Sequence, residues 1–227
     1  MPSPSPGRRA GRPRSADADR AILAATRSAL VELGWSGLTL GDVAARAGVA
    51  KTTLYRRWAG KNELVVDAVA ALFEEQLELP DLGSLEADIH GVVMCFAGLL
   101  DRPETRTALM AVVAEGTNDE ALRLRIREAI VDRQKHLVLT GRKRAQQRGE
   151  LPPDEGPVGP DGTDGAAGPD GPGSSAYPAR DDLIFDVIAG AVVHRLMVSS
   201  QPVDDEWAES LAHLLVAGLA GLHTGRA

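Results

Sequence analysis

Apolar residues recur along most of this chain at spacings of three and four positions, the period of an α-helix that buries one face. In the first such stretch Ile22, Thr26, Ala29 and Leu33 share one face, and Gly34 follows at the position of a helix stop. The pattern contains no convincing strand. It therefore predicts an all-α protein.

Capping residues and helix breakers divide the pattern into helices of ordinary length. Thr39 with Asp42 forms a capping box, Ser84 and Asn118 cap later helices, and Pro103 suits a first turn. We expect helices at 17–33, from 40, 51–58, 61–77, 85–100, 103–115, 119–148, 180–199 and 204–223.

Breaks in composition divide these helices into two domains. We expect a disordered basic arm at 1–16, a three-helix head at 17–63 and a helical body at 84–224. A fourth helix links the head to the body and ends at about 78. Residues 149–179 hold eight Gly and seven Pro, with Gly at every third position from 156 to 171. A collagen triple helix needs three chains and a longer run, so we interpret 150–179 as a disordered insertion.

Charge is distributed unevenly over the chain. Residues 1–61 hold 11 Lys and Arg against 4 Asp and Glu, whereas residues 62–227 hold 14 against 28. A basic head on an acidic body is typical of a nucleic-acid-binding module attached to a domain that does not touch nucleic acid. Arg8, Arg9, Arg12 and Arg14 of the arm are expected to lie along phosphates or to enter a minor groove.

Residues 39–63 have the pattern of a helix-turn-helix. Ala44 permits close approach of two helices, Gly48 makes the turn, and Val49 fills the interface. Leu54 and Trp58 would anchor the second helix on its buried face. This leaves a polar and basic set on or beside the exposed face, which suits a DNA major groove: Lys51, Thr52, Thr53, Tyr55, Arg56 and Arg57. A short helical hairpin with a basic surface is the alternative.

Together with Gly60-Lys61-Asn62-Glu63-Leu64, these residues resemble the TetR/AcrR family of transcriptional regulators. The resemblance is close over 17–72 and extends to the architecture elsewhere. It implies that Thr52, Thr53, and Arg56 or Lys51 read base edges, and that phosphates are contacted by Thr39, Tyr55, Arg57 and Lys61. Whether Arg56 or Arg57 reads bases stays open. Ala50 stands where the family usually has a capping Ser or Thr.

For the body, the resemblance implies a homodimer and a pocket for a small-molecule effector. The last two helices would pair with their partner copies, with these interface candidates: Val187, Ala191, Leu211, Leu215 and Leu219. The candidate pocket residues are His90, Met94, Phe96, Met110, His136, Phe185, His194 and Met197. We expect a repressor that binds a two-fold DNA operator and is released by an apolar or weakly polar effector. The alternatives are a transcriptional activator and a ligand-independent architectural protein.

Several other classes of protein are disfavoured. The chain lacks Gly-x-Ser-x-Gly, His-Glu-x-x-His, a phosphate loop and a cysteine pair, so we expect neither an enzyme nor a cofactor. His90 and Met94 alone are too few ligands for a metal. One cysteine, no signal-peptide pattern and no long apolar run predict a cytoplasmic protein that does not contact membranes.

Overall fold

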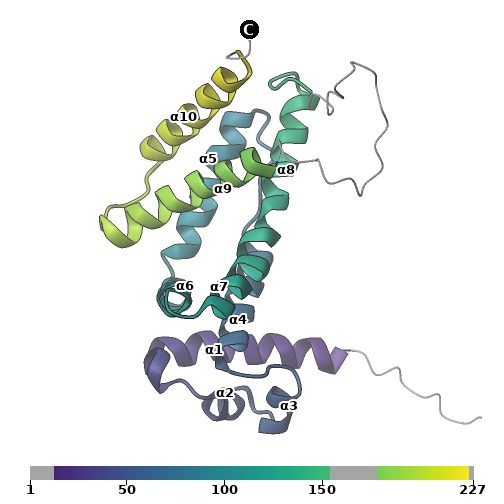
Figure 1. Ribbon diagram of the computed structural model, residues 1–227, viewed down its shortest axis with the longest axis vertical. Helices are drawn as coiled ribbons and strands as arrows, with labels where there is room; N and C mark the ends of the chain where they lie inside the picture. The colour runs from purple at the N-terminus through teal and green to yellow at the C-terminus, as the bar shows by residue number, and fades with distance from the viewer. Residues whose placement is uncertain (1–12, 154–177, 225–227) are drawn as a thin grey trace, which may run out of the picture. The chain divides into compact units, whose positions relative to one another are not determined.

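The computed structural model describes residues 13–153 and 178–224, and every regular element in these two ranges is helical (Figure 1). This confirms the all-α class. The α-helices are, in chain order, α1 Pro13–Gly37, α2 Leu40–Ala47, α3 Lys51–Tyr55, α4 Lys61–Gln76, α5 Leu85–Leu100, α6 Pro103–Gly116, α7 Glu120–Ile126, α8 Asp132–Gln147, α9 Pro178–Val193 and α10 Asp205–Thr224. Two short π-helices complete the set, η1 Arg127–Val131 and η2 His194–Val198.

The chain folds as two compact units whose limits differ from the predicted domains. Unit 1 comprises residues 1–71 and 103–129, and unit 2 comprises residues 72–102 and 130–227. Helices α6 and α7 therefore group with the helix-turn-helix rather than with the rest of the body. Most of the predicted arm and insertion, at 1–12 and 154–177, lies outside the described residues.

Unit 1 is built around α1, which packs against both α2 and α6. Its core contains the fully buried side chains of Ile22, Leu30, Val43 and Val66. Burying each of these stabilises the fold by roughly 1.5–3 kcal/mol. Thr26 is also buried, and its hydroxyl is paired because it donates a 2.8 Å hydrogen bond to the carbonyl of Ile22.

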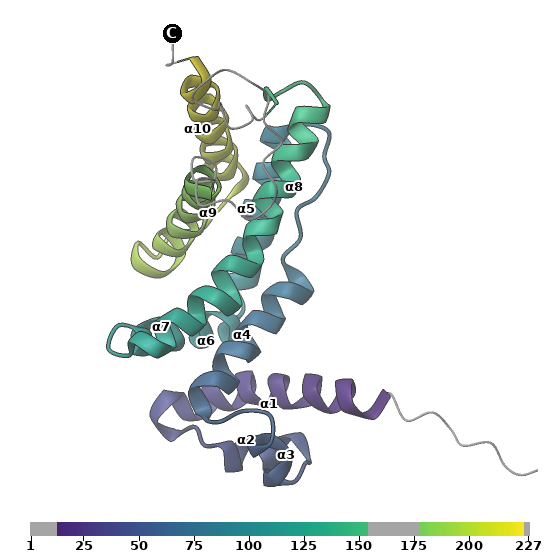
Figure 2. The ribbon, with the colours of Figure 1, turned by 45° about the vertical axis from the view of Figure 1, so that its right-hand side comes forward.

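Unit 2 is built around α5, which contacts α8, α9 and α10 (Figure 2). Val93 and Leu100 of α5 are fully buried. Phe96 meets Phe73, from the last turn of α4, edge to face with ring centroids 5.9 Å apart. Within the described ranges, none of the helices combines the length and the apolar content needed to cross a membrane.

Most predicted helix boundaries lie close to those of the structure, and several do not. Helix α1 ends at Gly37 rather than 33, and the helix predicted at 180–199 is divided into α9 and η2. Helix α1 begins at Pro13 rather than 17, and the α-helical part of α3 ends at Tyr55 rather than 58. The single helix predicted at 119–148 is divided into α7, η1 and α8. Its cap is Asp119, whose Oδ1 accepts a 3.0 Å hydrogen bond from Leu122 N, and not Asn118.

Candidate DNA-binding surface and effector cavity

The turn of the helix-turn-helix has the geometry that its sequence predicts. The hydroxyl of Thr39 accepts a 3.2 Å hydrogen bond from the N–H of Asp42, which caps α2. At the other end Gly48 adopts the left-handed conformation (φ 66°, ψ 32°), and Val49 N donates to Ala44 O at 3.0 Å. The cap and the glycine thus fix the length of α2 and the direction of the chain into α3.

Helix α3 is anchored by buried side chains and has no side-chain cap at its start. Leu54 is completely buried and Trp58 is 6% exposed, so both anchor the helix as predicted. Backbone hydrogen bonds continue the turn as far as Trp58, whose N–H donates to Leu54 O at 2.9 Å. Ala50 offers no side-chain cap, which leaves the first N–H groups of α3 without one.

The predicted DNA-contacting residues divide into two groups by exposure. Five are exposed, namely Thr39, Lys51, Thr52, Tyr55 and Arg56, and three are partly buried, namely Thr53, Arg57 and Lys61. The Lys51 ammonium lies over the first turn of α2, where a Cβ added to Gly41 would meet its Nζ at 3.0 Å and the Thr39 hydroxyl at 3.4 Å. The starts of α2 and α3 therefore form one cationic and hydroxyl-bearing surface.

The structure separates the two neighbouring arginines. The Arg57 guanidinium forms an ion pair with Asp19 of α1, and its side chain is 21% exposed. The Arg56 side chain is exposed. An arginine already paired with a carboxylate must give up or share that pairing before it reads a base, so Arg56 is the better placed of the two.

Lys61 also has a contact within the protein. Its ammonium donates a 2.8 Å hydrogen bond to the carbonyl of Trp35 and lies 4.9 Å from the centroid of the Trp35 ring. An ammonium has three donors, so a phosphate contact from Lys61 stays a prediction. The contact shows that Lys61 also fastens the start of α4 to the end of α1.

A second ion pair connects α1 to α2. Both guanidinium Nη atoms of Arg46 donate to the carboxylate of Glu32, with Nη1 at 2.9 Å from Oε1. The hydrogen bond from Arg46, followed by its positive charge, lowers the pKa of the Glu32 carboxyl. Such bidentate pairs define orientation as well as attraction.

Unit 2 contains an apolar cavity of about 110 Å³. One water needs roughly 10–15 Å³ of such space, so the cavity has room for a molecule larger than water. It is lined by Phe73, Leu77, Leu79, Leu85, Asp88, Ile89, Val92, Phe96, Gln134, Leu137, Val138, Gly141, Arg142, Leu151, Ile184, Phe185, Ile188, Ala189 and Leu219. Nearly all of this surface is aliphatic or aromatic, which favours an apolar occupant.

Only two of the predicted pocket residues, Phe96 and Phe185, line this cavity. The other six lie outside this lining, and their place in an effector pocket stays a prediction: His90, Met94, Met110, His136, His194 and Met197. Aromatic, Met and His side chains at helical spacing do not reveal which side of a helix faces the cavity. Met110 belongs to unit 1 and is 40% exposed, while His90 faces α10, with Nε2 3.3 Å from an Asp205 oxygen.

The α8 wall of the cavity contains none of the predicted pocket residues. Gln134, Leu137, Val138 and Gly141 fall on one face of α8 at spacings of three and four, and all four line the cavity. Gln134, a polar residue in an otherwise apolar stripe, was the sequence signal for this wall. Within the described residues, no group of three or more His, Cys, Asp or Glu side chains could hold a metal ion.

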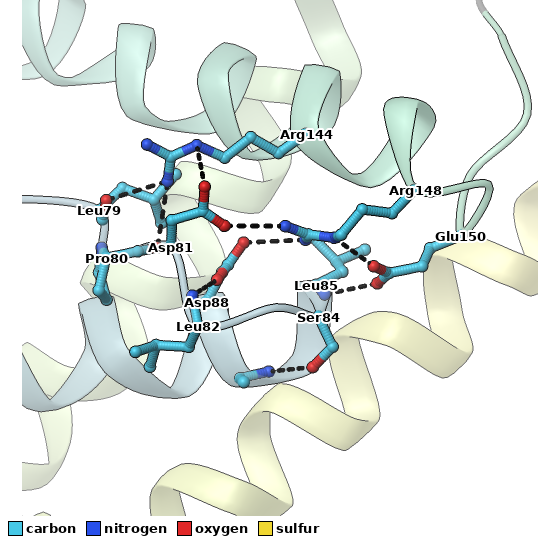
Figure 3. Close-up of polar contacts among 11 residues, drawn as sticks. Leu79, Pro80, Asp81, Leu82, Ser84, Leu85, Asp88, Arg144, Arg148 and Glu150 are labelled. Carbon is cyan, nitrogen blue, oxygen red and sulfur yellow. Dashed lines mark hydrogen bonds and ion pairs between the residues drawn. The ribbon is translucent and has the colours of Figure 1, made fainter.

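An ion-pair network stands at the end of the cavity formed by Leu79, Leu85 and Asp88 (Figure 3). The Arg148 guanidinium lies between the carboxylates of Asp81, Asp88 and Glu150, with Nη2 2.9 Å from Asp88 Oδ2. Hydrogen bonds to Glu150 and then Asp88 raise the pKa of Arg148 above its ordinary value. The network fastens the loop before α5 to the end of α8.

A capped helix-turn-helix with an exposed polar helix, together with a separate helical unit that contains an apolar cavity, defines a helix-turn-helix transcriptional regulator. Two family models match the chain: bacterial regulatory proteins of the tetR family over residues 22–68, and the tetracyclin repressor-like C-terminal domain over residues 79–158. The chain belongs to the TetR family of transcriptional regulators, whose members bind DNA.

Relatives and solved structures agree with this assignment over most of the chain. The HTH-type transcriptional regulator YdeS of Bacillus subtilis (strain 168) is 25% identical over 205 residues, which is 88% of this chain and 89% of YdeS. Rv1556 of Mycobacterium tuberculosis (strain ATCC 25618 / H37Rv), also an HTH-type transcriptional regulator, is 27% identical over 84% of this chain and 81% of its own length.

Among crystal structures, the TetR family transcription regulator SCO0332 has a TM-score of 0.65 and is 26% identical, over 89% of this chain and 98% of its own. FadR from Bacillus subtilis, solved with stearoyl-CoA, has a TM-score of 0.57 and is 17% identical, over 87% of this chain and 97% of its own. At that identity the FadR likeness shows the fold alone.

Proposed function

We propose that this regulator is a repressor that binds a two-fold operator as a homodimer and is released by a small apolar or weakly polar effector. The observation that carries the proposal is the apolar cavity of unit 2 in the same chain as a helix-turn-helix. A body used for dimerisation alone needs no such cavity. An effector can release DNA only by binding the DNA-free state more tightly than the DNA-bound state.

On the DNA side, α3 and the turn that follows it enter the major groove. Thr52, Thr53 and Arg56 read base edges, since a threonine methyl suits thymine and a guanidinium suits guanine. Tyr55, which is 60% exposed, and the surface formed by Lys51 and Thr39 contact phosphates. The ion pair of Arg57 with Asp19 supports Arg56 as the arginine that reads bases.

The dimer is formed by α9 and α10. Leu183 of α9, Val198 of η2 and Leu214 of α10 are 54%, 69% and 66% exposed in the single chain. Of the interface candidates, Leu211 is 7% exposed on the side of α10 that packs within the subunit, and Leu219 lines the cavity. Leu214 therefore replaces Leu211 as the proposed contact, and the two-fold pair presents two heads to two half-sites.

The effector is inferred from this chain's own cavity. FadR was solved with stearoyl-CoA, which has a long apolar chain, but its likeness to this protein does not extend beyond the fold. The cavity here is lined by residues of α5, α8, α9 and α10 and by Phe73 at the end of α4, so an apolar molecule inside it would contact five helices.

Fluorescence anisotropy of the upstream intergenic DNA, measured over a salt series, tests the proposal. We expect nanomolar affinity, two subunits per site, and a steep fall of affinity with salt as counterions are released. Thr53→Ala and Tyr55→Ala should each weaken operator binding while thermal unfolding stays unchanged. Unchanged affinity in both variants contradicts the docking of α3.

Leu214→Arg tests the dimer with the same assay. Because Leu214 is 66% exposed in the single chain, an arginine there leaves the subunit folded but places two charges in the proposed interface. We expect a monomer by sedimentation and a loss of tight operator binding. A control, Leu139→Arg at an exposed position of α8, should remain dimeric. Equal binding to operator and scrambled DNA would indicate the architectural alternative.

A further inference from the structure

The cavity of unit 2 contains a polar side chain whose hydrogen-bonding groups are all unpaired. Gln134 is 1% exposed, and neither its Nε2 nor its Oε1 has a hydrogen-bond partner in the described part of the chain. An unpaired buried amide costs free energy that a leucine or methionine of similar size would not. Its presence in the wall of an apolar cavity indicates that another molecule completes its hydrogen bonds.

The other polar residues of the cavity wall are already engaged. Asp88 accepts from Leu82 N at 2.6 Å through Oδ1 and from Arg148 at 2.9 Å through Oδ2. Arg142 also has an interaction within the protein. Among the described lining residues, Gln134 is thus the one polar side chain with both donor and acceptor capacity to spare.

We infer that the effector is an apolar molecule with one uncharged group that both donates and accepts a hydrogen bond, of the primary carboxamide or lactam class. This inference rests on the proposed function. In the complex, Gln134 Oε1 accepts from the ligand N–H, and Gln134 Nε2 donates to the ligand carbonyl. A carboxylate would match Nε2 alone, an ammonium Oε1 alone, and a hydrocarbon neither.

The desolvation of charged groups adds to this selectivity. An ionised carboxylate or ammonium must leave water to enter an apolar cavity. The charged residues of the wall already have partners within the protein, since Asp88 is paired with Arg148 and Arg142 also has an interaction. A neutral amide loses less hydration and regains both hydrogen bonds from Gln134.

Calorimetric titration of the full-length protein at pH 7 with four probes of equal chain length tests this assignment: hexanamide, hexanoate, hexylammonium and hexane. We expect hexanamide to bind wild type at least about tenfold more tightly than the other three. Gln134→Leu should reduce hexanamide affinity to that of hexane, leave hexane binding intact, and raise the Tm of the unliganded protein. Gln134→Met provides the same test if the leucine variant does not fold. Gln147→Leu, at an exposed position on the same helix, should bind all four probes as wild type does.

The outcomes separate this inference from the proposed function. Hexane binding without a preference for hexanamide, or a preference that survives in Gln134→Leu, overturns the role of Gln134 and leaves the cavity as an effector site. Failure of all four probes, hexane included, in a protein that still binds its operator overturns the cavity as an effector site and the inference with it.

Discussion

The indole Nε1 of Trp58 donates a 2.9 Å hydrogen bond to Oδ2 of Asp67 on α4. The other oxygen of the same carboxylate accepts a 2.7 Å hydrogen bond from Arg125 of α7. The Asp67 carboxylate thus holds both Trp58, in the turn after α3, and Arg125 of α7. Neither Asp67 nor Arg125 was a candidate in the sequence, since their contacts span 9 and 58 positions.

Asp67→Ala should destabilise the protein by about 1–3 kcal/mol, because the indole N–H of Trp58, a residue 6% exposed, loses its acceptor. Arg125→Met should cost less than about 1 kcal/mol, because the pair it breaks is partly exposed. Urea unfolding followed by circular dichroism measures both. Equal losses in the two variants would contradict the importance of the Trp58 hydrogen bond.

Gly34 and Gly48 should respond differently to the same substitutions, although both have φ of 66°. A Cβ at either position would meet no atom within 4 Å, so the cost of substitution is backbone strain alone. Gly48 has ψ of 32°, a conformation that asparagine tolerates, whereas Gly34 has ψ of 177°, which is essentially restricted to glycine.

We expect Gly48→Ala to cost about 1–2 kcal/mol, Gly48→Asn less than that, and both Gly34→Ala and Gly34→Asn about 1–3 kcal/mol. Chemical denaturation of the four variants is the measurement. Rescue by asparagine at both positions would show that the strain at Gly34 has been misjudged.

Local signals in the sequence were sufficient for the head and insufficient for the cavity. The Thr39 cap, the Gly48 turn and the burial of Leu54 are set by residues a few positions apart, and the structure has all three. The cavity joins α4, α5, α8, α9 and α10, and its lining depends on how each helix is rotated. Leu211 and Leu214 illustrate the difficulty, since both are apolar residues on α10 and only the packing makes one buried and the other exposed.

Ala50→Thr should stabilise the protein by about 1 kcal/mol, because its hydroxyl can supply the side-chain cap that Ala50 does not give to the start of α3. Ala50→Val has nearly the same shape without the hydroxyl and should bring no such gain. Tm measurements on the two variants separate capping from side-chain volume. Ala50→Thr should also bind the operator more tightly, since less ordering of α3 is left for the complex. Equal Tm values for Thr and Val would refute capping.

The pair formed by Glu32 and Arg46 should give acid sensitivity to the contact between α1 and α2. Arg46 lowers the pKa of Glu32 below its ordinary value of 4.5, so the stabilisation is fully present above pH 4.5 and is lost as the pH falls through the lowered pKa. NMR titration of the Glu32 carboxyl should show its pKa rising toward 4.5 in Arg46→Gln. The stability difference between wild type and the variant should shrink below pH 4.5. A Glu32 pKa that is the same in both proteins would exclude the interaction in solution.

Arg148→Met should lower the Tm more than Arg144→Met. The first substitution leaves the Asp88 carboxylate, whose side chain is 0% exposed, with only the N–H of Leu82 as a partner, and a buried charge without its counter-charge is strongly destabilising. Arg144 pairs with Asp81, which is 60% exposed and can be hydrated instead. Adding Asp88→Asn to Arg148→Met should recover part of the loss, because a neutral amide needs no counter-charge. Differential scanning calorimetry of the three variants measures these Tm differences. A double variant no more stable than Arg148→Met would mean that the unpaired charge of Asp88 does not cause the loss of stability.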